Sequence, residues 1–139
     1  MTPKQVIESW MQRVWADRDV SAIDELLADP CMVKGLSTEP ITSPEEFKVF
    51  HSKMLEAFTS INITMEDLVE SGQFICGIGH VEVVHRATGK SGSFTIGVYG
   101  RFVDDKWVEA NNTADFLTLL IQLGEVPETA LESVLTYAH

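Results

Sequence analysis

Asp115 is the residue with the clearest potential for chemistry in this sequence. It ends an alternating segment that begins at Trp107, and it directly precedes the apolar run 116–123. Burial among such apolar side chains would raise the pKa of a carboxyl group toward neutrality. A carboxyl group with a pKa near neutrality can remove a proton and return it, so Asp115 is a candidate general acid and base.

The alternating segment also suggests a pocket wall. In a strand, Trp107, Glu109, Asn111, Thr113 and Asp115 would lie on one face, and smaller side chains would lie on the other. A face that is both large and polar is unusual for a core strand and is typical of a pocket with a few placed polar groups. We therefore predict that Asn111 and Thr113 contact a substrate.

Each of the candidate catalytic residues also has a structural alternative. Asp is among the preferred N-cap residues, so Asp115 could instead begin the helix predicted at 116–123. His80 could relay a proton to Asp115, or it could be a hydrogen-bonded core histidine between Ile78 and Val81. His51 lies on an apolar helix face, where packing in the core is the expected role.

Composition limits the other classes of function. A chain of 139 residues with 45% hydrophobic residues predicts one globular domain, residues 1–139. The net charge of −11 argues against binding to nucleic acid or to an anionic membrane surface. No apolar run is long enough for a membrane span and no signal peptide is recognisable, so a cytoplasmic protein is expected, with Cys31 and Cys76 as buried thiols.

Helical and strand periodicities alternate along the chain in a defined order. Capping signals at Thr2 and Ser43 predict helices over 2–17 and 43–60, and a shorter helix is predicted over 21–28. A short strand is expected at 31–36, and period-two runs separated by turn residues predict four further strands between residues 61 and 115. Another short helix follows Asp115. A last helix from Pro127 would carry Leu131, Val134, Leu135 and Ala138 on one side.

This order predicts an α+β fold. Its expected form is a cone-shaped, curved antiparallel sheet with about three helices packed in its concavity and a short C-terminal helix. Such a cone can hold a small apolar molecule at its wide end. The predicted lining residues are Trp10, Trp15, Met54, Phe58, Phe74 and Val98.

The arrangement resembles the nuclear-transport-factor-2-like superfamily and, within it, the SnoaL-like polyketide cyclases. The resemblance lies in the helix pair QRVWADRDVSAIDELLADPCMV, in MLEAF, in the Thr-Gly-Lys turn at 88–90, and in GRFVDDKWVEANNTADFLTLLIQLG. It implies that Asp115 is the catalytic acid and base and that His80 is an inward-facing histidine. It also implies an aldol-type ring closure without metal or cofactor, and a homodimer formed through the exposed sheet face.

Some positions depart from the pattern of the family. Asn111 stands where the family usually has a tryptophan. Val14, Gly35 and Val98 occupy the places of the tyrosine and two aspartates of ketosteroid isomerases, so steroid isomerisation is not expected. Arg101 is the only strand arginine near the pocket, and its parity places it opposite the inward row, which argues against limonene-epoxide-hydrolase chemistry.

The resulting expectation is a SnoaL-like enzyme that cyclises or isomerises a small apolar carbonyl compound. Two alternatives remain at this point. The protein could be a non-catalytic carrier or sensor that binds a hydrophobic molecule in the same pocket, or a dimeric accessory domain whose pocket is filled by its own side chains. The sequence carries no recognisable metal-binding motif.

Overall fold

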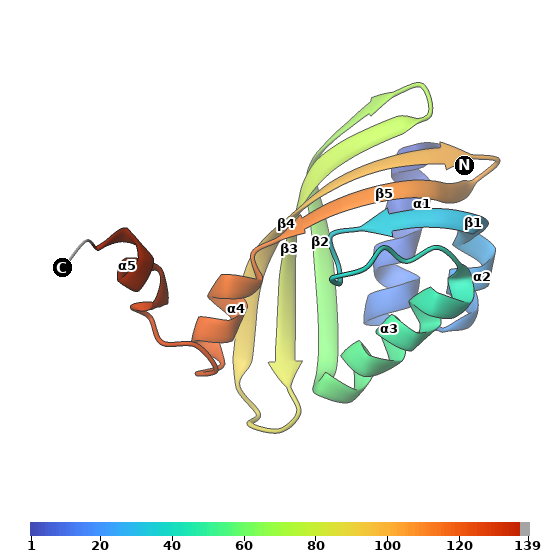
Figure 1. The fold of residues 1–139 in the computed structure, drawn as a ribbon. Helices are drawn as coiled ribbons and strands as arrows, with labels where there is room; N and C mark the ends of the chain where they lie inside the picture. The colour runs from blue at the N-terminus through green and yellow to red at the C-terminus, as the bar shows by residue number, and fades with distance from the viewer. Residues whose placement is uncertain (137–139) are drawn as a thin grey trace.

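The computed structural model describes residues 1–136, which form a curved sheet with the N-terminal helices grouped on one side and the C-terminal helices at the other end (Figure 1). The helices are α1 (Pro3–Trp10), the π-helical turn η1 (Met11–Ala16), α2 (Ser21–Leu26), α3 (Pro44–Ala57), α4 (Phe116–Gln122) and α5 (Ala130–Leu135). The strands are β1 (Leu27–Lys34), β2 (Phe58–Ser71), β3 (Phe74–His85), β4 (Ser91–Val103) and β5 (Lys106–Ala114). The predicted α+β architecture is confirmed.

The five strands have the spatial order β1-β5-β4-β3-β2. The four strands from β2 to β5 pair antiparallel as successive hairpins, whereas β1 pairs with β5 in parallel. The sheet therefore has one parallel edge pair in an otherwise antiparallel arrangement. At this β1–β5 edge, Gly35, which directly follows β1, lies against Asn112 of β5.

The helix starts follow the capping signals in the sequence. The Thr2 side chain accepts a hydrogen bond from the backbone N–H of Gln5, and the Gln5 side chain accepts one from the backbone N–H of Thr2. The Ser43 side chain caps α3 through the backbone N–H of Glu46. The helix predicted over 2–17 continues beyond α1 as the π-helical turn η1, which contains the buried residues Met11, Val14 and Trp15.

Two arginines bind the C-terminal end of α3. Arg18 donates to the backbone oxygens of Leu55 and Phe58, and Arg86 donates to those of Leu55 and Glu56. The last carbonyl groups of a helix have no partner within the helix, and cationic side chains satisfy them favourably. These contacts tie α3 to the loop before α2 and to the end of β3.

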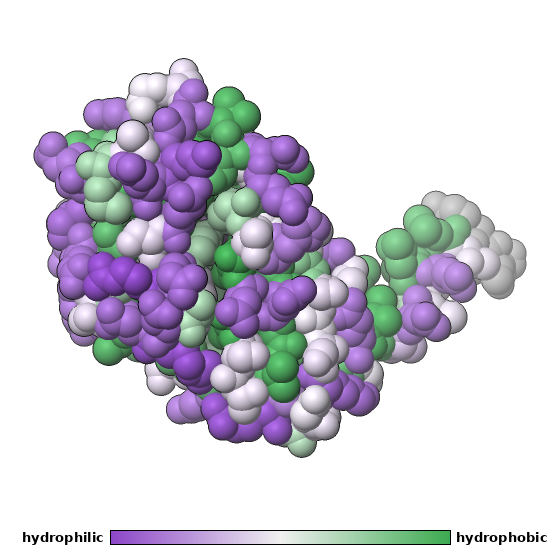
Figure 2. All heavy atoms as spheres, turned by 180° about the vertical axis from the view of Figure 1, so that it is seen from behind, coloured by the Kyte–Doolittle hydropathy of each residue, from purple (hydrophilic) through white to green (hydrophobic). Residues whose placement is uncertain are grey.

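The core lies between the helices α1 to α3 and the inner face of the sheet. The C-terminal segment leaves at the opposite end, as Figure 1 shows, and α5 contains no buried residue. Its predicted apolar side is exposed at Leu131, Val134 and Leu135, and Figure 2 shows hydrophobic atoms at the surface of this projecting segment. Ala138, which was predicted on the same side, lies outside the described residues.

Cys31 is buried, as predicted, and burial raises the pKa of its thiol to about 11. The prediction for Cys76 is wrong, because this residue is exposed on the outer face of β3. Its neighbours Ile75 and Gly77 occupy the positions of β3 that face inward. None of the described helices is long and apolar enough to cross a membrane.

Candidate functional site

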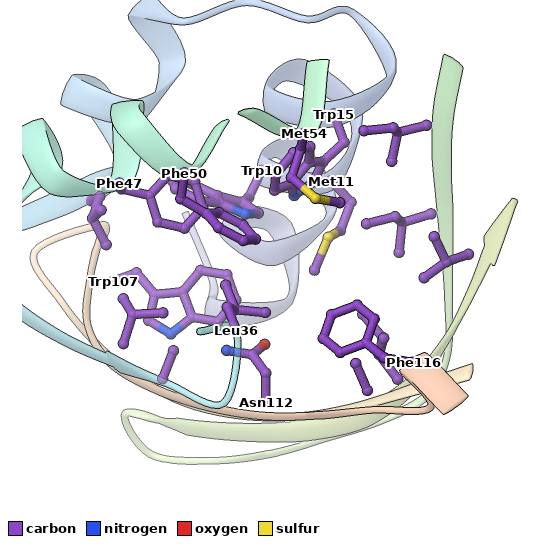
Figure 3. Close-up of a pocket in the computed structure, with 18 of the residues that line it drawn as sticks. Trp10, Met11, Trp15, Leu36, Phe47, Phe50, Met54, Trp107, Asn112 and Phe116 are labelled. Carbon is purple, nitrogen blue, oxygen red and sulfur yellow. The ribbon is translucent and has the colours of Figure 1, made fainter. Parts of the chain in front are cut away.

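The cone contains a cavity between the inner sheet face and the helices α1 and α3 (Figure 3). The space open to the centre of a water molecule is about 70 Å³. The cavity is therefore not filled by the protein's own side chains, which argues against the accessory-domain alternative. Its wall contains Trp10, Met11, Trp15, Leu27, Val33, Leu36, Phe47, Phe50, Met54, Ile61, Ile63, Val81, Phe94, Ile96, Trp107, Ala110, Asn112, Ala114 and Phe116.

The predicted pocket face of β5 is wrong beyond Trp107. Trp107 pairs with Phe102, but the adjacent β4 residue, Arg101, pairs with Glu109, so Val108 is an extra residue on β5. Such a bulge reverses the alternation of the side chains that follow it. Trp107 and Ala110 are consequently both buried, with exposed fractions of 4% and 3%.

The bulge exchanges the two predicted faces. Ala110, Asn112 and Ala114 line the cavity, whereas Asn111 and Thr113 are exposed on the outer face. The substrate contacts predicted for Asn111 and Thr113 are therefore not supported by their placement. The small size of Ala110 and Ala114 was the available signal, because small side chains leave space in front of a strand.

Asp115 does not face the cavity. Its carboxylate accepts hydrogen bonds from the backbone N–H of Thr118 over 3.1 Å and from the Thr118 hydroxyl over 2.5 Å. The bond from the hydroxyl group, followed by the bond from the backbone N–H, lowers the pKa of Asp115 below its usual value. The apolar sequence around Asp115 had predicted a raised pKa, and this prediction is wrong. The capping alternative is confirmed. The opposite end of α4 is held by Gln122, which exchanges two hydrogen bonds with the backbone of Ser93.

His80 is also on the outer face, with its side chain 51% exposed, which corrects the inward orientation implied by the family resemblance. Its Nε2 lies 3.2 Å from a carboxylate oxygen of Glu66 on β2. His80 and Asp115 border the same shallow depression, together with Thr95 and Thr118. The two residues are thus neighbours on the surface, but the apolar cavity lies on the other side of the sheet.

The predicted aromatic and apolar lining residues are divided between three places. Trp10, Trp15 and Met54 line the cavity, as predicted. Phe58 and Val98 are buried in the core without bordering the cavity. Phe74 is 42% exposed on the outer face, where its ring stacks on Tyr99 with 5.9 Å between the ring centroids. Successive side chains of β3 point to opposite faces of the sheet, and Ile75 is the one that points inward, so Phe74 points outward.

Asn112 was missed as a lining residue, and it is the only amide, hydroxyl or charged side chain in the cavity wall within residues 1–136. Its Nδ2 donates to the backbone oxygen of Lys34 over 3.1 Å. A carbonyl oxygen can only accept, so this contact determines which end of the amide carries the nitrogen. Figure 3 shows the Asn112 amide among the apolar side chains of the cavity, opposite Trp10 and Trp15.

His51 supports the helical wall of the cavity from behind. Its Nε2 lies 2.7 Å from the carbonyl oxygen of Val14, so this nitrogen carries a hydrogen, and its ring lies 5.1 Å from the Trp15 ring between centroids. Burial, followed by the positive charge of Arg18, lowers the pKa of His51, and the bond to Val14 opposes this shift. His51 is therefore a positioning residue for Trp15, with an exposed fraction of 1%.

No group of three or more His, Cys, Asp or Glu residues within 1–136 has an arrangement that could hold a metal ion. The cavity wall itself contains no carboxylate, imidazole or thiol in the described part of the chain. The arrangement can bind and orient a small apolar molecule by shape and a few hydrogen bonds.

Replacement of Asp115 by alanine tests the capping role. We expect a lower melting temperature, because α4 loses its N-cap, and unchanged affinity for a molecule bound in the cavity. Thermal denaturation and calorimetric titration of the same samples measure the two quantities. Asp115→Asn, which keeps a capping side chain, should retain most of the stability; loss of ligand affinity in either variant would contradict the separation of Asp115 from the cavity.

The cone-shaped sheet, its covering helices and its apolar cavity define the class of the protein. Residues 7–110 match the family model of the SnoaL-like domain. The chain therefore belongs to the SnoaL-like domain family, with the nuclear-transport-factor-2-like fold that the sequence predicted. No curated protein matches the sequence.

Solved structures with the same fold come from several bacteria. IdmH, a proposed polyketide cyclase from Streptomyces antibioticus, has a TM-score of 0.79 and 20% identity, covering 89% of this chain and 99% of its own. AclR, a proposed hydroxylase from Streptomyces galilaeus, has a TM-score of 0.77 and 21% identity, covering 89% and 96%. A proposed SnoaL-like polyketide cyclase from Jannaschia sp. CCS1 has a TM-score of 0.77 and 12% identity, covering 88% and 92%. At these identities the likeness shows the fold.

Proposed function

We propose that the protein binds a small, largely apolar carbonyl compound in the cavity of the cone. The observation that carries this proposal is an open cavity whose wall is aromatic and aliphatic apart from the Asn112 amide. Binding sites for small molecules usually combine an apolar wall with very few placed polar groups. The function most directly supported is therefore the second one considered from the sequence, a carrier or sensor.

Cavity filling tests this proposal. Ala114→Phe should place a ring in the cavity and lower the affinity for 1-tetralone, a bicyclic aromatic ketone, by at least about tenfold, because the bulky side chain occupies the binding space. Thr113→Phe is the matched control, since Thr113 is the adjacent residue on the outer face. Isothermal titration calorimetry measures both affinities. Equal affinities of the two variants for the ketone would contradict the proposal, because the ketone would then bind outside the cavity.

A second candidate is the aldol-type cyclisation or isomerisation that the family membership suggests. Two of the structural relatives are themselves proposed polyketide cyclases, and this favours a polyketide-like carbonyl compound as the ligand. In such a reaction the cavity would hold the chain of the substrate in a folded, reactive geometry. Mass spectrometry of the ligand after incubation distinguishes the candidates, because a carrier returns it unchanged.

The predicted homodimer stays a prediction. The outer sheet face offers a place for it, since Phe74, Ile78 and Tyr99 expose apolar surface there, with exposed fractions of 42%, 48% and 39%. A second copy seated on this face would cover these side chains and the depression that contains His80 and Asp115. The cavity itself would stay on the other side of the sheet.

A further inference from the structure

The polar atoms of the cavity lie on two opposite walls. Asn112 extends from β5 on the sheet wall, and Trp10 and Trp15 come from α1 and η1 on the helical wall (Figure 3). A molecule in the cavity meets the Asn112 amide on the sheet wall and the indole rings of Trp10 and Trp15 on the helical wall. The chemistry of these atoms therefore limits which molecules fit.

Asn112 offers an acceptor. Because its Nδ2 donates one hydrogen to the backbone oxygen of Lys34, its Oδ1 and the second Nδ2 hydrogen remain for a ligand. The amide cannot readily reverse, since the reversed form would bring two acceptor oxygens together and leave the Lys34 carbonyl without a donor. A ligand hydroxyl group can donate to Oδ1 and accept from the second Nδ2 hydrogen, so this wall of the cavity favours a hydroxyl group.

Trp10 and Trp15 offer donors. The third cavity tryptophan, Trp107, donates its indole N–H to the backbone oxygen of Glu109 over 2.8 Å. Within residues 1–136, the indole N–H groups of Trp10 and Trp15 have no such hydrogen-bond partner. Every polar side-chain atom that is fully enclosed in this part of the chain does have a partner. Neither N–H group is therefore fully enclosed, although the two side chains are only 4% and 6% exposed, and both side chains border the cavity.

We infer that the cavity selects a ligand with a hydroxyl group at one end, donated to Asn112 Oδ1, and a carbonyl oxygen at the other, which accepts from the indole N–H groups. A hydroxyaryl ketone is the simplest compound of this class. The inference rests on the proposed ligand-binding function and specifies its ligand. A buried donor or acceptor left without a partner weakens binding markedly, so compounds that lack either group should bind less tightly.

Four bicyclic probes separate the two contacts by calorimetric titration of the wild-type protein. 6-Hydroxy-1-tetralone carries both groups, 6-methoxy-1-tetralone lacks the hydroxyl donor, 5,6,7,8-tetrahydro-2-naphthol lacks the carbonyl, and 1-tetralone carries only the carbonyl. We expect 6-hydroxy-1-tetralone to bind about tenfold more tightly than the methoxy ketone and than the tetrahydronaphthol, which corresponds to one hydrogen bond in each case. This comparison needs no protein variant.

Neighbouring residues provide matched controls for the protein side. Asn112→Leu should bind the hydroxy and methoxy ketones equally, whereas Asn111→Leu, altered on the outer face, should keep the preference. Trp15→Phe should reduce the advantage of 6-hydroxy-1-tetralone over the tetrahydronaphthol, and Tyr99→Phe, altered on the outer face, should leave it. Binding of 1-tetralone with no preference among the other three probes overturns this inference alone, whereas no binding of any probe overturns the proposed function with it.

Discussion

Gly35→Ala is expected to destabilise the protein by about 4 kcal/mol, among the largest effects of a single substitution. Gly35 has a φ of +89°, and a Cβ atom built on it would lie 1.8 Å from the backbone oxygen of Asn112. This distance is far inside the roughly 3.3 Å at which such atoms meet. The segment after β1 would have to move away from β5, and the Lys34 contact that orients the Asn112 amide would be disturbed.

Gly89→Ala is the control for this prediction. Gly89 also has a positive φ, +70°, but its Cβ position has no atom within 4 Å. Its replacement should cost only about 1 kcal/mol, the strain of a left-handed alanine. Urea denaturation of the two variants measures the difference. If both were equally stable, the close approach of Gly35 to Asn112 would have no energetic consequence.

His51→Ala is expected to destabilise the protein by about 3 kcal/mol, because the change opens a cavity and leaves the Val14 carbonyl without its donor. Trp15 also loses the imidazole against which its ring packs. We therefore expect weaker binding of 1-tetralone as well as lower stability. Chemical denaturation and calorimetric titration measure the two effects. His51→Gln, whose side-chain amide can donate to Val14, should retain part of both.

The lowered pKa of His51 gives the stability a defined pH dependence. The unfolded chain takes up a proton on this residue near pH 6.5, whereas the folded protein resists protonation to a lower pH. The unfolded state therefore binds more protons as the pH falls below about 6.5, and the contribution of His51 to the unfolding free energy decreases in that range. Between pH 7 and pH 5 the wild-type protein should lose more stability than His51→Gln; parallel losses would contradict the assignment.

The separation of Asp115 from the cavity changes how the chemistry is approached. The expected acid/base pair, Asp115 and His80, borders a depression on the outer sheet face, and the cavity wall offers hydrogen-bonding groups without a titratable side chain in the described residues. A ligand search that begins from binding is therefore more direct than one that begins from an assay of turnover. The hydroxyaryl ketones provide a first set of compounds.

Most local features could be predicted from the sequence. The capping residues Thr2 and Ser43 begin their helices as expected, and the helical spacing of Trp10 and Trp15 placed both on the wall that borders the cavity. These features depend on residues a few positions apart, whose interactions the sequence contains directly. The predicted family resemblance used the same order of elements, and the match of residues 7–110 to the family model confirms it.

The orientation of β5 required the tertiary structure. Both Asn111 and Asn112 are compatible with a pocket wall, and only the pairing of β5 with β4 determines which of them points inward. The sequence also could not decide between the two roles of Asp115, helix cap and catalytic acid/base. Both roles need an aspartate directly before α4, and they differ only in the side of the sheet that the carboxylate faces.

The sequence by itself determined the α+β class, the order of helices and strands, and the apolar character of the cavity wall. Only the tertiary structure decided which polar residue enters the cavity, where Asp115 and His80 lie, and that the cavity is open. The physical reason is that periodicity is a local property, whereas the bulge at Val108 arises from the register between β4 and β5 and shifts every following side chain to the other face.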